Sequence, residues 1–254
     1  MRLKGKVAIV TGAGSGFGAG IARKFVAEGA RVVLADIDLE AALDVAAALG
    51  EHARALRVDV ADATDVRLMM EAAELHFGRI DILVNNAGVT HLPQPLEDVA
   101  EADFDRIVAV NMKAIYLAMR EAVPRLKANA PGVQGIRGVV LNMASTAGVS
   151  PRPRLAWYNA SKGWVITATR AHAVELAPFG IRVVALNPVA GETPLLKSFM
   201  GQDTPEMRAK FLATIPLGRF STPEDLGHAA CFLCSDEASM ITGVCMEVDG
   251  GRCI

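Results

Sequence analysis

Short runs of aliphatic and β-branched residues alternate with longer segments of helical periodicity along the 254 residues of the chain. The runs typical of buried strands are residues 6–12, 30–36, 53–60, 80–88, 138–145, 181–188 and 243–251. The segments whose apolar residues recur at helical spacing are 18–29, 39–50, 62–77, 97–127, 157–178 and 222–235. This alternation predicts an α/β fold, a doubly wound and mostly parallel sheet of about seven strands with helices on both faces.

Residues 188–220 form the one long irregular stretch of this pattern. A long excursion is more often functional than accidental, so we expect a substrate lid at about 190–217. Four apolar residues in it recur at helical spacing, Leu195, Leu196, Phe199 and Met200. They either line an apolar pocket or pack the lid onto the body of the protein. Without a linker or a repeat, residues 1–254 are expected to form one domain.

The composition narrows the partners that the protein can have. Hydrophobic residues make up 52% of the chain, and the net charge is −2 without any basic block. We therefore expect no nucleic acid and no membrane among its partners. No apolar run approaches the ~20 residues that span a bilayer, and the first residues are typical of a strand rather than a signal peptide. A cytoplasmic location is the expectation.

Cys231 and Cys234 form a C-x-x-C pair. Such a pair can carry out redox chemistry or bind a metal, but zinc needs two further ligands nearby and a thioredoxin-like pair stands at a helix start. This pair comes late in the predicted helix 222–235. We therefore interpret both cysteines as buried apolar groups and expect no metal site.

A glycine-rich turn, "TGAGSGFG", follows the first strand and opens the first helix. Its glycines are Gly12, Gly14, Gly16 and Gly18. Glycine permits a tight turn there, and it lets backbone N–H groups and the positive end of the helix approach a pyrophosphate. The turn therefore indicates a phosphate-binding loop.

Two aspartates end the second and third strands, and each has two interpretations. Asp36 can accept hydrogen bonds from the hydroxyls of an adenosine ribose, or it can cap the next helix, although Asp38 is better placed for capping. Asp59 can bind the adenine amino group or make a turn. A glycine loop between strand and helix, with an acid at the end of the second strand, favours a Rossmann-like dinucleotide site.

Tyr158 and Lys162 stand four residues apart in "WYNASKG" and so share one face of a predicted helix. The pair can simply decorate an exposed helix, or the ammonium can lower the pKa of the phenol so that it exchanges a proton near neutral pH. Ser145 ends the fifth strand, and Asn111 lies in the long fourth helix. All four lie at carboxyl ends of strands or on adjacent helices, where parallel sheets bind ligands.

The motifs "TGAGSGFG", "NNAG", "NMAS", "YNASK" and "NPVAGETP", together with Asn111, resemble those of the short-chain dehydrogenase/reductase family in its single-domain form. They occur in the family's order and cover nearly the whole chain. The resemblance implies one dinucleotide-binding and catalytic domain that transfers a hydride between a nicotinamide cofactor and a small alcohol or ketone. One departure is Val189 after Pro188, where the family usually has glycine; its side chain could reshape the nicotinamide end of the pocket and cannot adopt positive φ easily.

The resemblance implies a role for each catalytic residue. Tyr158 would be the general acid/base, Lys162 would lower its pKa and hold the nicotinamide ribose, and Ser145 would hydrogen-bond the substrate oxygen. Asn111 would bend its helix and hold a water in a proton relay through Lys162. Thr193 would hold the nicotinamide carboxamide.

The cofactor-binding residues that we expect are Gly12, Ser15, Gly16, Phe17, Gly18, Asp36, Ile37, Asp59, Val60, Asn86, Ala87, Gly88, Tyr158, Lys162, Pro188 and Thr193. The carboxylate at Asp36 would repel the 2′-phosphate of NADP. Neither Ser15 nor Ile37 offers a compensating cation. The sequence therefore predicts NAD as the cofactor.

Four residues are candidates for substrate contacts: His91, Arg152, Arg154 and Leu195. The two arginines could bind a carboxylate, sulfonate or phosphate, or they could lie on a solvated loop. His91 could shuttle protons or occupy the rim. The expected substrate is a secondary alcohol, ketone, sugar or polyol. The alternatives are a 3-oxoacyl thioester and, outside enzymes, an idle dinucleotide-binding regulator.

The resemblance also implies a homotetramer. The predicted helices 103–127 and 157–178 carry long apolar faces. These faces include Ile115, Leu117, Val165 and Ile166. We expect them to be buried against another copy of the chain, because so much apolar area is unfavourable in water.

Overall fold

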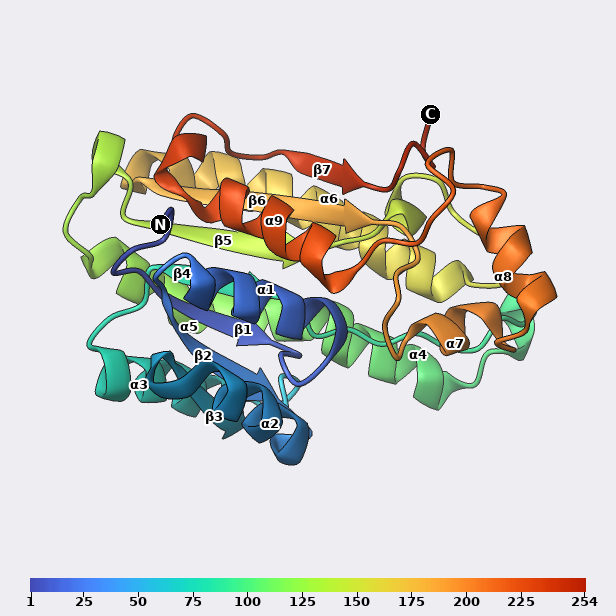
Figure 1. Ribbon diagram of the computed structural model, residues 1–254, viewed down its shortest axis with the longest axis horizontal. Helices are drawn as coiled ribbons and strands as arrows, with labels where there is room; N and C mark the ends of the chain where they lie inside the picture. Colours follow the sequence, from blue (N-terminus) through green and yellow to red (C-terminus); the bar gives the residue numbers. More distant parts are fainter.

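The computed structural model describes residues 1–254 and contains one seven-stranded sheet (Figure 1). Its strands are β1 (Val7–Thr11), β2 (Arg31–Asp36), β3 (Ala53–Arg57), β4 (Ile82–Asn85), β5 (Gly138–Met143), β6 (Ile181–Pro188) and β7 (Cys245–Val248). The spatial order is β3-β2-β1-β4-β5-β6-β7, and every neighbouring pair is parallel. The predicted doubly wound sheet is confirmed. The order reverses between β1 and β4, which places the ligand-binding crevice at their carboxyl ends.

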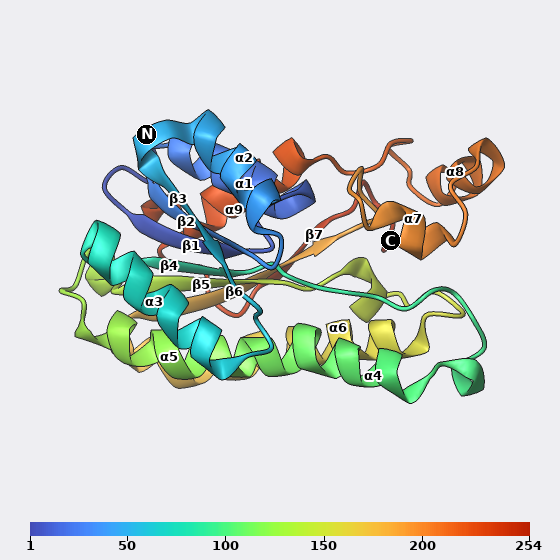
Figure 2. The same ribbon diagram turned by 90° about the horizontal axis from the view of Figure 1, so that it is seen from below.

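Helices cover both faces of the sheet, as Figure 2 shows. One face carries α1 (Gly16–Ala27), α2 (Leu39–Leu49) and α9 (Pro223–Cys234). The other face carries α3 (Ala63–Phe77), α4 (Glu101–Ile107), α5 (Ala114–Ala128) and α6 (Ala156–Leu176). An apolar cluster of 26 buried residues lies on the α1 side and one of 27 on the α5 side. The strands are thus buried on both faces, which explains their uninterrupted aliphatic runs.

The predicted helix over 97–127 is interrupted in the structure. A 3-10 turn at Leu96–Asp98 precedes α4, and a π-helical segment at Val108–Lys113 separates α4 from α5. Asn111 lies in this segment, and its side chain bonds to both the N–H and the carbonyl of Val89, at 2.9 Å each. π-helical turns of this kind often occur at functional sites.

Residues 188–220 are more regular than the sequence suggested. They contain α7 (Leu196–Met200) and α8 (Pro205–Leu212). Thr204 caps α8 by accepting a hydrogen bond from the N–H of Met207. Threonine followed by proline is a helix-start signal, so α8 could have been predicted. The remaining 3-10 turns are Gly50–His52, Val133–Gly135, Thr146–Gly148, Ala177–Phe179 and Asp236–Ala238.

The segment 188–220 has a small apolar core of its own. It consists of Val189, Leu196, Met200, Phe211, Ile215 and Phe220. Leu196 and Met200 therefore pack the segment together, whereas Leu195 and Phe199 line a pocket. Val189 has no positive φ, and its side chain contributes to this core. The glycine expected at this position is thus replaced without backbone strain.

The four apolar residues expected at a subunit interface are buried within the chain itself. Ile115, Leu117, Val165 and Ile166 all belong to the cluster between the sheet and helices α3, α5 and α6. The prediction from these residues was wrong, because their helices bury them against the sheet. No helix has both the length and the apolar character needed to cross a membrane.

Cys231 and Cys234 are buried in the cluster on the α1 side. Burial raises the pKa of the Cys234 thiol to about 12, which keeps it protonated at neutral pH. Both cysteines therefore act as buried apolar groups, as predicted.

Candidate active site

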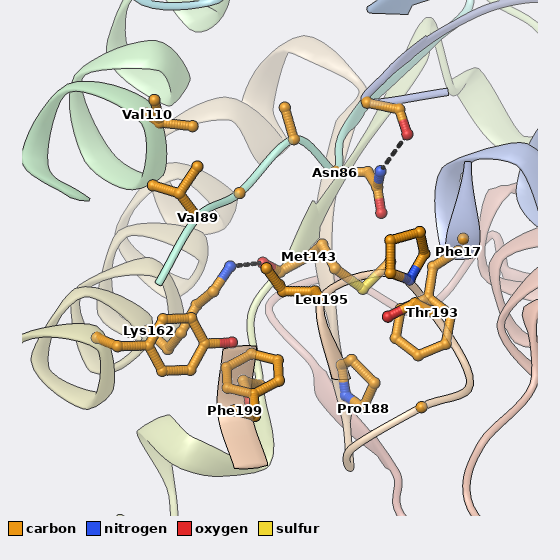
Figure 3. A pocket seen from close by; sticks show the side chains of 18 of the residues that line it. Phe17, Asn86, Val89, Val110, Met143, Lys162, Pro188, Thr193, Leu195 and Phe199 are labelled. Carbon is orange, nitrogen blue, oxygen red and sulfur yellow. Dashed lines mark hydrogen bonds between the residues drawn. The ribbon is translucent and has the colours of Figure 1, made fainter. Parts of the chain in front are cut away.

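A pocket of about 470 Å³ lies at the carboxyl ends of the central strands (Figure 3). Its volume is typical of sites for cofactors and small molecules. It brings together most of the predicted site residues, which come from the glycine loop, the strand ends, α6 and the segment 188–220. Those that line it are Gly12, Ser15, Gly16, Phe17, Asp36, Ile37, Asp59, Val60, Asn86, Ala87, Gly88, Ser145, Arg152, Tyr158, Lys162, Pro188, Thr193 and Leu195.

The glycine loop is shaped for close approach of a ligand. Gly12 has a φ of 64°, and a Cβ on it would lie 3.0 Å from Nδ2 of Asn86. That amide donates to the carbonyls of Thr11 and Gly12, at 2.8 and 3.1 Å. The helix α1 begins at Gly16 without a side-chain cap from Ser15. Its first N–H groups and the positive end of its dipole are left for an anion, so the loop fits a dinucleotide pyrophosphate.

Asp36 ends β2 with its carboxylate held by the backbone. Oδ2 accepts a hydrogen bond from the N–H of Gly14 at 2.8 Å, and Oδ1 accepts one from the N–H of Asp38 at 3.0 Å. Each oxygen keeps a further lone pair for a donor in the pocket. Asp38, not Asp36, caps α2, as expected from the sequence. This carboxylate is therefore placed to accept from a ribose diol.

Asp59 makes a local turn at the end of β3. Its Oδ1 accepts from the N–H of Ala61 at 2.9 Å and so makes a turn, and the residue also lines the pocket. Ile37, after Asp36, is 61% exposed and offers no cation. The end of the pocket at β2 and β3 thus contains two carboxylates, and Ile37 adds no positive charge to it.

Ser145, Tyr158 and Lys162 meet at the other end of the pocket, and all three are buried. Ser145 accepts a hydrogen bond from the N–H of Ala147 at 3.1 Å and is hydrogen-bonded to Tyr158. Lys162 Nζ donates to the carbonyl of Met143 at 2.8 Å, as Figure 3 shows, and lies 5.8 Å from the centre of the Tyr158 ring. A hydroxyl, a phenol and an ammonium therefore surround one small volume.

The pKa of Tyr158 differs from the expectation. Burial raises it to about 12, and the hydrogen bond with Ser145 opposes the rise. Burial also lowers the pKa of Lys162 to about 8. The ammonium of Lys162 donates to the carbonyl of Met143 rather than to the phenol.

Asn111 lies behind the lining and connects two parts of the site. Its Nδ2 donates to Oγ of Ser161 at 3.0 Å, and that hydroxyl donates to the carbonyl of Tyr158 at 2.7 Å. A Cβ on Gly88 would lie 3.4 Å from Oδ1 of Asn111 and 3.5 Å from Nζ of Lys162. The π-helical segment therefore fixes the position of α6, which carries Tyr158 and Lys162.

Three other predicted residues lie outside the lining. Gly18 stands in α1, where a Cβ would come 2.0 Å from the carbonyl oxygen of Gly12, so it permits the helix to pack on the turn. His91 is buried, with its Nδ1 bonded to the carbonyl of Leu92 at 2.8 Å. Arg154 is exposed and has a φ of 67°. The structure brings neither His91 nor Arg154 into the pocket.

Part of the apolar lining of the pocket was not predicted from the sequence. Phe211 and Leu155 line the pocket, and Phe199 lies edge-on to Tyr158 with ring centres 5.0 Å apart. The helical spacing of α8 could have indicated Phe211. No sequence pattern indicated Leu155 as a lining residue, because it precedes α6 in a short loop.

The comparisons agree with this site. The family model described as "Enoyl-(Acyl carrier protein) reductase" matches residues 12–252. The chain is 46% identical over 256 residues to 4-formylbenzenesulfonate dehydrogenase of Comamonas testosteroni, with 99% of each chain covered. It is 37% identical over 259 residues to galactitol 2-dehydrogenase of Agrobacterium fabrum, again with 99% of each covered.

A solved structure has the same fold. It is a 3-ketoacyl-(acyl-carrier-protein) reductase of Brucella melitensis complexed with NADH, 53% identical, with a TM-score of 0.93 over 99% of this chain and 100% of that one. The glycine loop, the buried Ser145–Tyr158–Lys162 group and these relatives define a Rossmann-like oxidoreductase. The chain belongs to the short-chain dehydrogenase/reductase family.

Proposed function

We propose that the protein is an NAD(H)-dependent dehydrogenase that interconverts a small alcohol and the corresponding carbonyl compound. The observation that supports this most is that the uncapped start of α1 and the carboxylate of Asp36 share one pocket with Ser145, Tyr158 and Lys162. The helix start and Asp36 are suited to bind a dinucleotide. Ser145, Tyr158 and Lys162 are suited to transfer a proton at a carbinol oxygen. An idle dinucleotide-binding regulator would not need the second group.

The chain's own residues move the proton. The nicotinamide, when bound, supplies the hydride acceptor for oxidation and the donor for reduction. During oxidation, Tyr158 as phenolate takes the hydroxyl proton of the alcohol; during reduction, its phenol returns a proton to the substrate oxygen. Ser145 accepts from the N–H of Ala147 and is hydrogen-bonded to Tyr158. We propose that its hydroxyl donates to the substrate oxygen when a substrate is bound. Ser145 orients this oxygen and does not attack, because its neighbour is a phenol rather than a basic imidazole.

Lys162 supplies a positive charge beside Tyr158. Its ammonium, now on the carbonyl of Met143 at 2.8 Å, is close to Gly88 and Asn111. In the loaded enzyme we propose that it holds the nicotinamide ribose and favours the phenolate by its charge. Asn111 holds α6 in register through Ser161. We propose that a water at Asn111 continues the proton path.

The cofactor preference follows from Asp36. At ~4 Å, two unit charges repel by ~4 kcal/mol at an effective dielectric of 20. The 2′-phosphate of NADP would meet such repulsion at this carboxylate, while a ribose diol would donate to it. The Brucella melitensis structure, which holds NADH, supports the same preference.

The substrate that we propose is a small alcohol or ketone, including polyols. The relative named galactitol 2-dehydrogenase supports this class, and residues 190–217 would act as its lid. Phe199 from α7 contacts Tyr158, so the lid closes over the reacting end. A 3-oxoacyl thioester remains the second candidate because of the name of the Brucella melitensis structure.

We also propose a homotetramer, which light scattering at micromolar concentration would test.

The test is a panel of alcohols, polyols, ketones and one 3-oxoacyl thioester, followed by nicotinamide absorbance with both cofactors. We expect turnover of small alcohols or ketones, with a higher kcat/KM for NAD(H) than for NADP(H). Turnover of the thioester alone would favour the second candidate. A folded protein that binds NADH but reacts with no member of the panel would contradict the proposal.

A further inference from the structure

Arg152 is a guanidinium at the substrate end of the pocket, on the loop that precedes α6. It is partly buried, and its Cζ lies 4.2 Å from the centre of the Phe211 ring. Its Nη2 lies 3.3 Å from Oγ1 of Thr214, a neutral hydroxyl. Its neighbour Arg154 is exposed and does not line the pocket. The two arginines of the "PRPR" loop are therefore in different environments.

The protein provides no carboxylate for Arg152. None of its ion pairs involves this residue or Arg252. Arg252 donates to Oγ of Ser150 at 2.9 Å, and its Nε is buried without a partner. The nearby acid of the C-terminal segment, Asp249, accepts instead from the N–H groups of residues 251 and 253, at 2.9 and 2.8 Å.

Arg252, which does not line the pocket, is near enough for its charge to act on Arg152. Burial, and next the charge of Arg252, lower the pKa of Arg152 to about 10. The guanidinium is still protonated at neutral pH. A partly buried cation with planar donors and no anionic partner is suited to bind a carboxylate or sulfonate.

An apolar path connects this cation to the catalytic phenol. Tyr158 contacts Phe199 of α7, Leu155 packs in the same small cluster, and Phe211 of α8 lies under the guanidinium. All of these residues line one pocket. A ligand that fits it has a carbonyl or carbinol group at one end, a compact apolar body, and an anionic group at the other end.

We propose that Arg152 determines substrate specificity by binding a carboxylate or sulfonate carried on an apolar alcohol or ketone. This inference rests on the proposed function, because it assumes that the reacting group lies at Tyr158. A different role for Arg152 is to hold α8 through Phe211 and Thr214. In that role its loss would weaken the binding of charged and neutral ligands alike.

The test measures binding rather than turnover. Calorimetry gives the Kd of 4-acetylbenzoate and of its neutral counterpart 4-acetylbenzamide with NAD⁺-loaded protein, in which a ketone cannot be reduced. A second pair, 4-acetylbenzenesulfonate and 4-acetylbenzenesulfonamide, distinguishes sulfonate from carboxylate. The variants are Arg152→Gln and, as a matched control with the same charge change two residues away, Arg154→Gln.

We expect the wild-type protein to bind at least one anion ~10-fold or more tightly than its neutral counterpart, as charge-assisted hydrogen bonds allow. Arg152→Gln should lose this preference and keep the Kd of the neutral ketone within ~3-fold, and Arg154→Gln should keep the preference. Equal binding of anion and amide in the wild type, a preference that survives in Arg152→Gln, or parallel losses for both ligands would overturn the proposal. Turnover in the panel above tests the proposed function separately, since this comparison needs no hydride transfer.

Discussion

Replacing Lys162 by methionine should stabilise the fold while it removes activity. The ammonium is buried with only 5% of the residue exposed, and burial lowers its pKa from the ordinary 10.5 to about 8. Each pKa unit corresponds to about 1.4 kcal/mol, so keeping this lysine charged costs about 3 kcal/mol at neutral pH. Methionine has a similar shape and no charge, but it leaves the carbonyl of Met143 without its hydrogen bond, a loss of about 1 kcal/mol.

Lys162→Met should therefore raise the free energy of unfolding by about 2 kcal/mol at pH 7. Its pH dependence has a defined sign. The folded-state pKa lies below the unfolded one, so the unfolded state binds more protons between pH 8 and 10.5. The cost of burying the charged lysine in the wild-type protein is therefore fully present below pH 8. It disappears as the pH rises from 8 to 10.5. The advantage of the variant should shrink over the same range.

Urea unfolding at pH 7 and at pH 10, at one protein concentration, measures both effects. Lys162→Gln, which keeps a hydrogen-bond donor for the carbonyl of Met143, is the matched control and should retain part of the gain. A variant that is less stable than the wild type at pH 7, or a difference that does not change with pH, would refute the reasoning. Such a result would mean that Lys162 contributes to folding rather than only to chemistry.

Two further predictions concern the cofactor and the proton. Asp36→Ala should narrow the preference for NAD(H) over NADP(H), mainly by weakening the binding of NAD(H) and by removing repulsion of the 2′-phosphate. The ratio of kcat/KM for the two cofactors measures this preference. An unchanged ratio would show that the carboxylate does not select between the cofactors. The rate of alcohol oxidation should rise with pH, because burial raises the pKa of Tyr158 to about 12 and the residue must be deprotonated to accept a proton. Initial rates in the folded protein would contradict this if they fell between neutral and mildly alkaline pH.

The sequence was sufficient for the sheet because its signals are local. Aliphatic strands that are buried on both faces need no polar alternation, and the glycine loop requires conformations such as the φ of 64° at Gly12. The candidate cofactor-binding residues were predicted from their places at strand ends. The lining of the pocket thus contains Asp36, Tyr158 and Lys162, which the motifs had already indicated.

The features of the site that could not be predicted from the sequence depend on tertiary packing. Arg152 and Arg154 are equivalent in the chain, yet only Arg152 lines the pocket, while Arg154 is exposed and has a φ of 67°. The apolar faces of α5 and α6 could equally have met another subunit or the sheet, and Ile115 and Val165 pack toward the sheet. The pKa of Tyr158 was expected to fall, but it depends on burial, which no spacing of residues reveals.

The central claim is that Tyr158 transfers the proton. The most direct measurement is the rate of alcohol oxidation by Tyr158→Phe, together with its Kd for NADH. The account predicts a loss of at least ~100-fold in rate, the range that one acid/base group supplies, with binding of NADH close to that of the wild type. Substantial turnover in this variant, with substrate bound, would contradict the account.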